Sequence, residues 1–75
     1  MIKWADGQYN TTHASVGVFH LKTMWKGEDN PGHVFEIVGL ARSNKRFVDH
    51  GQAQVACEKS LEGFLKDALK IIRGK

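Results

Sequence analysis

The spacing of apolar residues changes once along the chain, near Gly51. Between residues 15 and 50, apolar and polar side chains alternate and β-branched and aromatic residues are frequent, which is typical of strands. After that point apolar residues recur every three or four positions, as on one side of an amphipathic helix. These residues are Ala53, Cys57, Leu61, Phe64, Leu65, Ala68, Leu69 and Ile72. The chain is therefore expected to form a sheet followed by one long helix.

Three strands are predicted in the alternating part. They span residues 15–25, 33 to about 42, and 45 to about 50. Asn30-Pro31-Gly32 places Pro and Gly where a type II turn requires them, and Ser43-Asn44 is expected to form a tight turn. Gly17 and Gly39 fall inside predicted strands, where a bulge or a close backbone approach is the usual reason for glycine.

Residues 1–14 are polar around Trp4 and Tyr9, and we expect an N-terminal arm or an extra strand there. The helix is expected to end near Arg73-Gly74, because glycine is frequent just after a helix. Gly63 inside the helix is expected to mark close contact with the sheet or with a partner. The fold class is thus α+β: a single β-β-β-α domain over residues 15–75, with a three-stranded antiparallel sheet packed on one C-terminal helix.

Even spacing within each predicted strand divides the sheet into two faces. The face expected to pack on the helix carries Phe19, Leu21, Phe35, Ile37 and Phe47. The opposite face carries Val18, His20, Lys22, Glu36, Val38, Leu40, Arg46, Val48 and His50. One helix covers one face of a small sheet, so this mixed second face needs another cover. The arm, a second subunit or a binding partner are the three candidates.

The composition describes one small soluble domain. The chain has 75 residues, of which 41% are hydrophobic and 25% charged. A chain of this size buries only about 60% of the surface that its unfolded form exposes, which argues against an elaborate enzyme. No signal peptide and no apolar run that could span a membrane is expected. The single cysteine, Cys57, excludes an internal disulfide, and a cytoplasmic location is the expectation.

No residue pattern supports catalysis or a cofactor. Cys57 lies on the apolar stripe of the helix and is expected to be a buried structural residue. The histidines are His13, His20, His33 and His50, whose spacing fits no common metal site. Asp49-His50 and Glu28-Asp29 have no nucleophile or second carboxylate at a useful spacing. We therefore expect a non-enzymatic protein without metal or cofactor.

Positive charge is concentrated in the second half of the chain. Eleven Lys and Arg residues against eight Asp and Glu give a formal charge of +3. A basic cluster of Arg42, Lys45 and Arg46 falls at the predicted hairpin tip, and Lys22 and Lys26 are expected nearby. The basic residues of the helix alternate with acidic ones, which indicates a solvated face.

A three-stranded sheet followed by a helix, over about residues 15–73, resembles in architecture the DNA-binding domains of the AP2 type and the arm-binding domains of tyrosine recombinases. The resemblance implies that the outer face of the sheet enters the major groove of DNA. The sheet and helix are also similar to part of a double-stranded-RNA-binding domain. That family's opening helix and Lys-rich helix start are missing, since Gln52-Ala53-Gln54 begins the helix here.

Two functions follow from the second face. In the first, Lys22, Arg42, Lys45 and Arg46 contact the phosphates of DNA or RNA, and His20 and His50 bond near base edges or sugars. In the second, the protein is a small protein-interaction module, such as an inhibitor or adaptor of the phage or plasmid type. A homodimer through the same sheet face is one form of this second function. Its apolar centre is then Val38, Leu40 and Val48, with charges at the rim.

Overall fold

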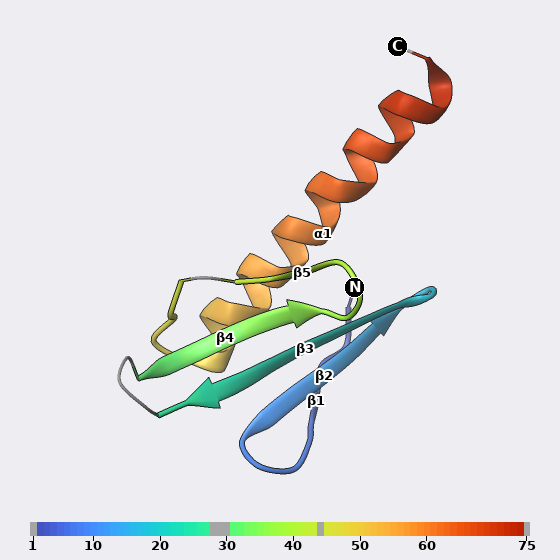
Figure 1. Cartoon of the computed structure of the whole chain (residues 1–75). Coiled ribbons are helices and arrows are strands. Elements are labelled where there is room, and N and C mark those ends of the chain that lie inside the picture. The colour runs from blue at the N-terminus through green and yellow to red at the C-terminus, as the bar shows by residue number, and fades with distance from the viewer. Residues whose placement is uncertain (1, 28–30, 44, 75) are drawn as a thin grey trace.

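The fold is an antiparallel sheet with one helix laid against it, shown in a computed structural model (Figure 1). The structure describes residues 2–27, 31–43 and 45–74. The elements are β1 (Ala5–Asp6), β2 (Thr11–Val16), β3 (Phe19–Lys26), β4 (Gly32–Ile37), β5 (Ala41–Arg42) and α1 (His50–Arg73). The strands lie in the order β1-β2-β3-β4-β5, each antiparallel to the next. The α+β class is confirmed, but the described residues form five strands where three were expected.

The predicted strand over residues 15–25 is in fact the end of β2, a turn and β3. Gly17 has a φ of +59°, a left-handed conformation that glycine adopts at no steric cost. It lets the chain reverse, so that Val16 pairs with Phe19. The alternating composition continues through this short turn, which is why the sequence pattern suggested one strand. The rest of β2, together with β1, lies in residues 1–14.

The predicted strand over residues 33–42 is divided in the same way. Gly39 has a φ of +82° in the turn between β4 and β5, and Arg42 pairs back onto Glu36. Val38 and Leu40 therefore lie in or beside a turn and not in a strand. The expectation that Gly17 and Gly39 occupy strands was wrong, because both supply the positive φ of a turn.

The predicted strand over residues 45–50 is not formed. Among its described residues, Phe47 makes an isolated bridge to His33, and α1 already begins at His50. The cause is Asp49, whose Oδ1 accepts a hydrogen bond of 2.8 Å from the backbone N–H of Gln52 and caps the helix. Asn30 and Asn44, from the two predicted turns, lie outside the described residues.

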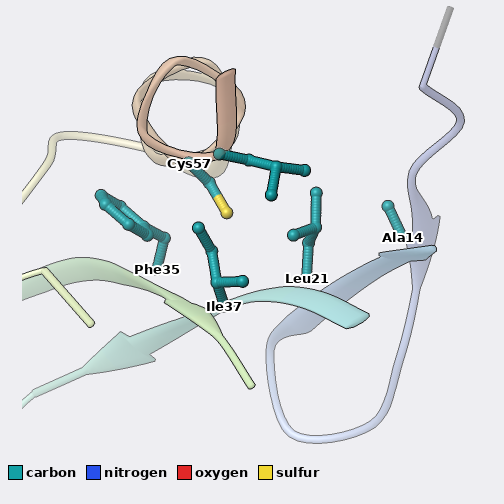
Figure 2. Packing of buried hydrophobic residues seen from close by; sticks show 6 residues of the cluster. Ala14, Leu21, Phe35, Ile37 and Cys57 are labelled. Atoms are coloured by element: carbon teal, nitrogen blue, oxygen red, sulfur yellow. The ribbon is translucent and has the colours of Figure 1, made fainter. Parts of the chain in front are cut away.

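The core lies between α1 and the inner face of β3 and β4 (Figure 2). Its buried members are Ala14, Leu21, Phe35, Ile37, Cys57 and Leu61. Phe19 and Phe47 pack against them in partly buried positions, so the predicted inner face is confirmed. Cys57 has no exposed surface, as expected, and burial followed by the nearby Glu58 charge raises the pKa of its thiol to about 11.

The N-terminal segment packs on the helix side of the sheet. Ile2 and Trp4 lie against the core, and Trp4 Nε1 donates a hydrogen bond of 2.7 Å to Glu58 Oε2 on α1. Tyr9, by contrast, is 92% exposed. Ile2, Trp4 and Tyr9 of the N-terminal segment therefore do not cover the outer face of the sheet.

The second half of α1 extends beyond the sheet (Figure 1). A helix of 24 residues is about 36 Å long, whereas the six residues of β4 span about 20 Å. Ala53, Cys57 and Leu61 are consequently buried. The later residues of the stripe were expected in the core and are exposed, because no described strand reaches them: Phe64, Leu65, Ala68, Leu69 and Ile72.

Gly63 lies in this projecting half. A Cβ built at Gly63 meets no described atom within 4 Å outside its own helix turn, so the expected close contact with the sheet is not present. Gly74, which ends the helix, has a φ of +70°. Gly63 therefore has room for a side chain within the helix, whereas Gly74 needs the left-handed backbone conformation that glycine adopts most easily.

Replacing Gly63 by Ala is expected to stabilise α1 by up to about 1 kcal/mol, because alanine has the higher helix propensity. The helical circular-dichroism signal and the urea midpoint should both rise. Gly74→Ala is the matched control and should lower both, since alanine is strained at positive φ. An unchanged or lower urea midpoint for Gly63→Ala would mean that the residue contacts something after all.

Candidate nucleic-acid interface

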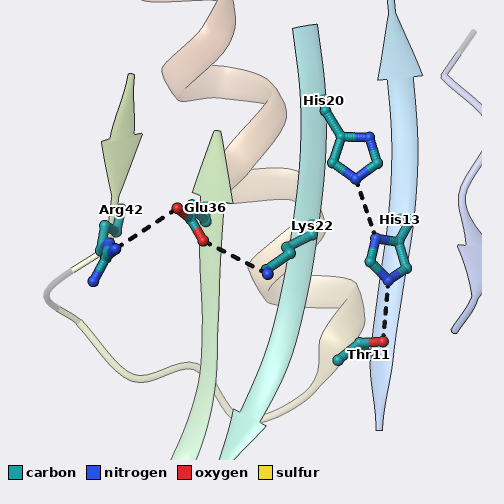
Figure 3. A network of polar contacts seen from close by, with 6 residues as sticks. All are labelled: Thr11, His13, His20, Lys22, Glu36 and Arg42. Atoms are coloured by element: carbon teal, nitrogen blue, oxygen red, sulfur yellow. Dashed lines mark hydrogen bonds and ion pairs between the residues drawn. The ribbon is translucent and has the colours of Figure 1, made fainter. Parts of the chain in front are cut away.

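The outer face of the sheet points away from α1. By strand alternation it carries Thr11, His13, Ser15, His20, Lys22, Met24, Val34, Glu36 and Arg42. The strand register pairs His13 with Lys22, Lys22 with Glu36, and Glu36 with Arg42. These four residues therefore form one row across β2, β3, β4 and β5, and Figure 3 shows them side by side. We call this the charged row.

Glu36 lies between two cations in the charged row. Its Oε1 is 3.9 Å from Lys22 Nζ, and its Oε2 is 3.8 Å from Arg42 Nη2 (Figure 3). The Arg42 side chain remains 79% exposed. The Arg42–Glu36 contact is long and its Arg42 end is exposed, so it contributes at most about 1 kcal/mol, and a phosphate can replace the carboxylate as the partner of Arg42. The row keeps one positive charge in excess.

Beside the charged row is an open hollow of about 330 Å³. Four basic residues line it, namely Lys22, Lys26, Arg42 and Arg46. Met24 and the buried Val34 supply its apolar part. Glu36 is the one carboxylate among the described lining residues. A cationic rim around an apolar floor suits a sugar-phosphate chain, whose phosphates need charge and whose sugars offer apolar surface.

The structure does not place Lys45 with the other predicted phosphate ligands. Its Nζ lies 5.7 Å from the centre of the Phe47 ring, on the rim of a different hollow against α1. The expected hairpin is absent because the chain returns along β4, where Ser43 N–H bonds to Phe35 O at 3.0 Å. Lys22, Arg42 and Arg46 come together as predicted, and Lys26, which was expected nearby, lies with them.

His20 lies on the outer face, as predicted, with a histidine partner that sequence analysis did not connect to it. His13 Nδ1 is 3.3 Å from His20 Nε2, and His13 Nε2 is 3.2 Å from Thr11 Oγ1 (Figure 3). His13 was missed because its segment was expected to be an arm or extra strand without a defined register. The available signal was weak: Thr11 and Thr12 are β-branched, and Ala14 and Val16 are apolar two positions apart.

His50 was predicted on the outer face and is instead the first residue of α1, on the inner side. Its Nδ1 is 2.7 Å from Thr23 Oγ1, and its ring packs edge-on against His33 with centroids 4.2 Å apart. Its Nε2 is buried with no hydrogen-bond partner among the described residues. Burial, and then the neighbouring His33, lower the pKa of His50. The helix cap at Asp49 turns this histidine away from the sheet's free face.

The predicted apolar centre is dispersed. Val38 and Leu40 are half-exposed at the turn that follows the end of β4. Val48 is 80% exposed and follows Phe47, which pairs with His33 near the start of β4. The three side chains therefore lie toward opposite ends of β4 and share no surface patch.

Within residues 2–27, 31–43 and 45–74, no three His, Cys, Asp or Glu side chains gather as metal ligands would. No helix of this described part combines the length and the apolarity needed to cross a membrane.

His50 should make stability depend on pH. An unfolded chain binds the proton near the ordinary histidine pKa of 6.5, whereas the folded protein binds it only at lower pH. The stabilising contribution of neutral His50 is therefore fully present above pH 6.5, and it is lost as the pH falls through the lowered pKa. Urea unfolding at about pH 7.5 and 5.0 should show a larger loss for the wild type than for His50→Gln, because the other histidines are common to both. Equal losses would contradict the role assigned to His50.

The outer face is thus the part of the molecule with the most recognisable chemistry. It brings together a charged row, a basic hollow and a histidine pair. Comparison of the chain with protein-family models, with curated proteins and with solved structures finds no match.

Proposed function

We propose that this protein is a small non-enzymatic nucleic-acid-binding protein that uses the outer face of its sheet. The observation that carries the proposal is the gathering of Lys22, Lys26, Arg42 and Arg46 around one hollow on the face that α1 leaves open. These residues come from two separate parts of the chain, β3 and residues 42–46, so the cluster is a product of the fold. Histidines at the β2 and β3 side of the same face supply hydrogen-bonding groups for sugars or base edges.

Duplex DNA is the favoured ligand. The major groove of DNA is about 12 Å wide and admits two neighbouring antiparallel strands, such as β3 and β4 of this face. The major groove of duplex RNA is deep and narrow, and side chains on a sheet do not reach its bases. Arg42 is the best-placed phosphate ligand, because its guanidinium is exposed and a planar fork fits a phosphate.

A protein partner is the second candidate, and one observation favours it. An open hollow of about 900 Å³ lies between the segment 45–49 and α1. Its apolar lining includes Phe47, Val48, Val55 and Ala56, with Lys45 and Lys59 at the edge. Val48, predicted as part of a protein interface, is thus beside a larger and less basic hollow than the one on the sheet.

The two functions can be separated by fluorescence anisotropy with a labelled mixed-sequence DNA duplex of about 20 base pairs. If four phosphates are contacted, the affinity should fall about 100-fold between about 50 and 200 mM salt. Arg42→Ala and Lys26→Ala should each weaken binding and lower the salt slope by about 1. Glu36→Gln should strengthen binding, because it removes the carboxylate that competes with phosphate.

Lys66→Ala and Lys70→Ala are the matched controls, since they remove the same charge from the exposed side of α1. If they weaken DNA binding as much as Arg42→Ala does, binding depends on the net charge of the protein, and the proposed site on the sheet is wrong. Loss of a protein partner on Val48→Asp, with no DNA binding at low salt, would favour the second function.

A further inference from the structure

The projecting half of α1 carries an apolar stripe that no described part of the chain covers. Phe64, Leu65 and Leu69 are 40–50% exposed, and Ile71 and Ile72 are about 80% exposed. At 100° per residue these side chains continue the line that buries Cys57 and Leu61 against the sheet. A continuous apolar surface of this kind marks an interaction site.

The N-terminal segment does not supply the cover. Ile2 and Trp4 already pack on the core, and Trp4 is hydrogen-bonded to Glu58 near the middle of the helix. The strands end where the projecting half begins (Figure 1). The stripe therefore needs a cover from outside the described chain.

We propose that a second copy of this chain covers the stripe, with the two projecting helices packed antiparallel about a twofold axis at the level between Lys66 and Asp67. In this register Phe64 lies level with Leu69 of the second copy, and Leu65 lies level with Ala68. Leu61, at the edge of the sheet, lies level with Ile72 of the second copy. These three levels pair apolar residues, and the small Ala68 leaves room for Leu65. Ile71, at the border of the stripe, lies level with Glu62 of the second copy.

Two charges beside the stripe, Glu62 and Arg73, agree with the antiparallel direction, whereas Asp67 lies nearly level with Asp67 of the second copy. Glu62 and Arg73 flank the same side of the stripe. In the proposed register Glu62 lies within about 3 Å along the axis of Arg73 of the second copy, and the symmetry makes this pair twice. A parallel pair would instead place Glu62 level with Glu62 and Arg73 level with Arg73. Opposed helix dipoles favour the antiparallel arrangement as well.

The interface is short, and we expect a weak dimer. Twelve helical residues span about 18 Å, which buries less than the roughly 800 Å² per partner of a standard interface. The dissociation constant is expected on the order of 10 µM, so the dimer forms only at high protein concentration. This interface leaves the charged row on the opposite side of the sheet open.

Sedimentation equilibrium of the full chain from about 1 to 500 µM tests the proposal. The wild type should pass from monomer to dimer across this range. Leu65→Glu should raise the dissociation constant at least about 100-fold, because it buries an unpaired charge at the centre of the interface. Ile72→Glu is a second variant. Ile72 is exposed in the last turn of α1, away from the sheet, so its replacement should not disturb the core. Circular dichroism should show that both variants remain folded.

Gly63→Glu is the matched control. It adds the same charge on the opposite side of α1, where a new side chain meets no described atom, and it should leave the dimer intact. A monomer at every concentration would overturn the proposal and mean that a different partner covers the stripe. A dimer that survives both Leu65→Glu and Ile72→Glu would place the interface elsewhere.

The direction of packing has its own test. Glu62→Arg and Arg73→Glu should each weaken the dimer about threefold to tenfold, and the double variant should recover most of the loss. Glu62 also pairs with Lys66 of its own helix at 3.8 Å, but that contact exists in monomer and dimer alike. No recovery in the double variant would overturn the antiparallel register.

Discussion

The packing of Cys57 and Leu61 onto Leu21, Phe35 and Ile37 is the contact on which this structure depends. All five residues are at most 8% exposed, and each large side chain contributes about 1.5–3 kcal/mol when it is fully buried. This one layer of contacts aligns α1 with β3 and β4. The layer reaches neither the outer face of the sheet nor the second half of α1, and the described residues form one hydrophobic core cluster.

Two uncovered surfaces result, and their chemistry differs. The outer face of the sheet has a paired carboxylate and cations, and water solvates it well. The far half of α1 has Leu65, Leu69 and Ile72, which water does not solvate well. The first surface is therefore suited to a charged, hydrated ligand such as a phosphate chain, and the second to another apolar surface. The fold separates these two kinds of contact on opposite sides of one small sheet.

Most of the helix and the inner face of the sheet were predictable from the sequence. The three-to-four spacing from Ala53 onward located α1, and the even spacing of Leu21, Phe35 and Ile37 located the core. The strand count was not predictable in the same way. Alternation has the same period on both sides of a tight turn, so Gly17 and Gly39 were interpreted as strand residues until their positive φ was known.

The site was predictable in part. Lys22, Arg42 and Arg46 were expected together and line one hollow. His50 lies on the inner side instead, because Asp49 caps a helix that begins two residues earlier than expected. The sequence by itself determined the class of fold, the buried cysteine and the amphipathic helix, because these depend on local periodicity. Only the tertiary structure decided the strand register that forms the charged row and the point where the sheet ends beneath α1. Both depend on contacts between residues far apart in the chain, which no local pattern encodes.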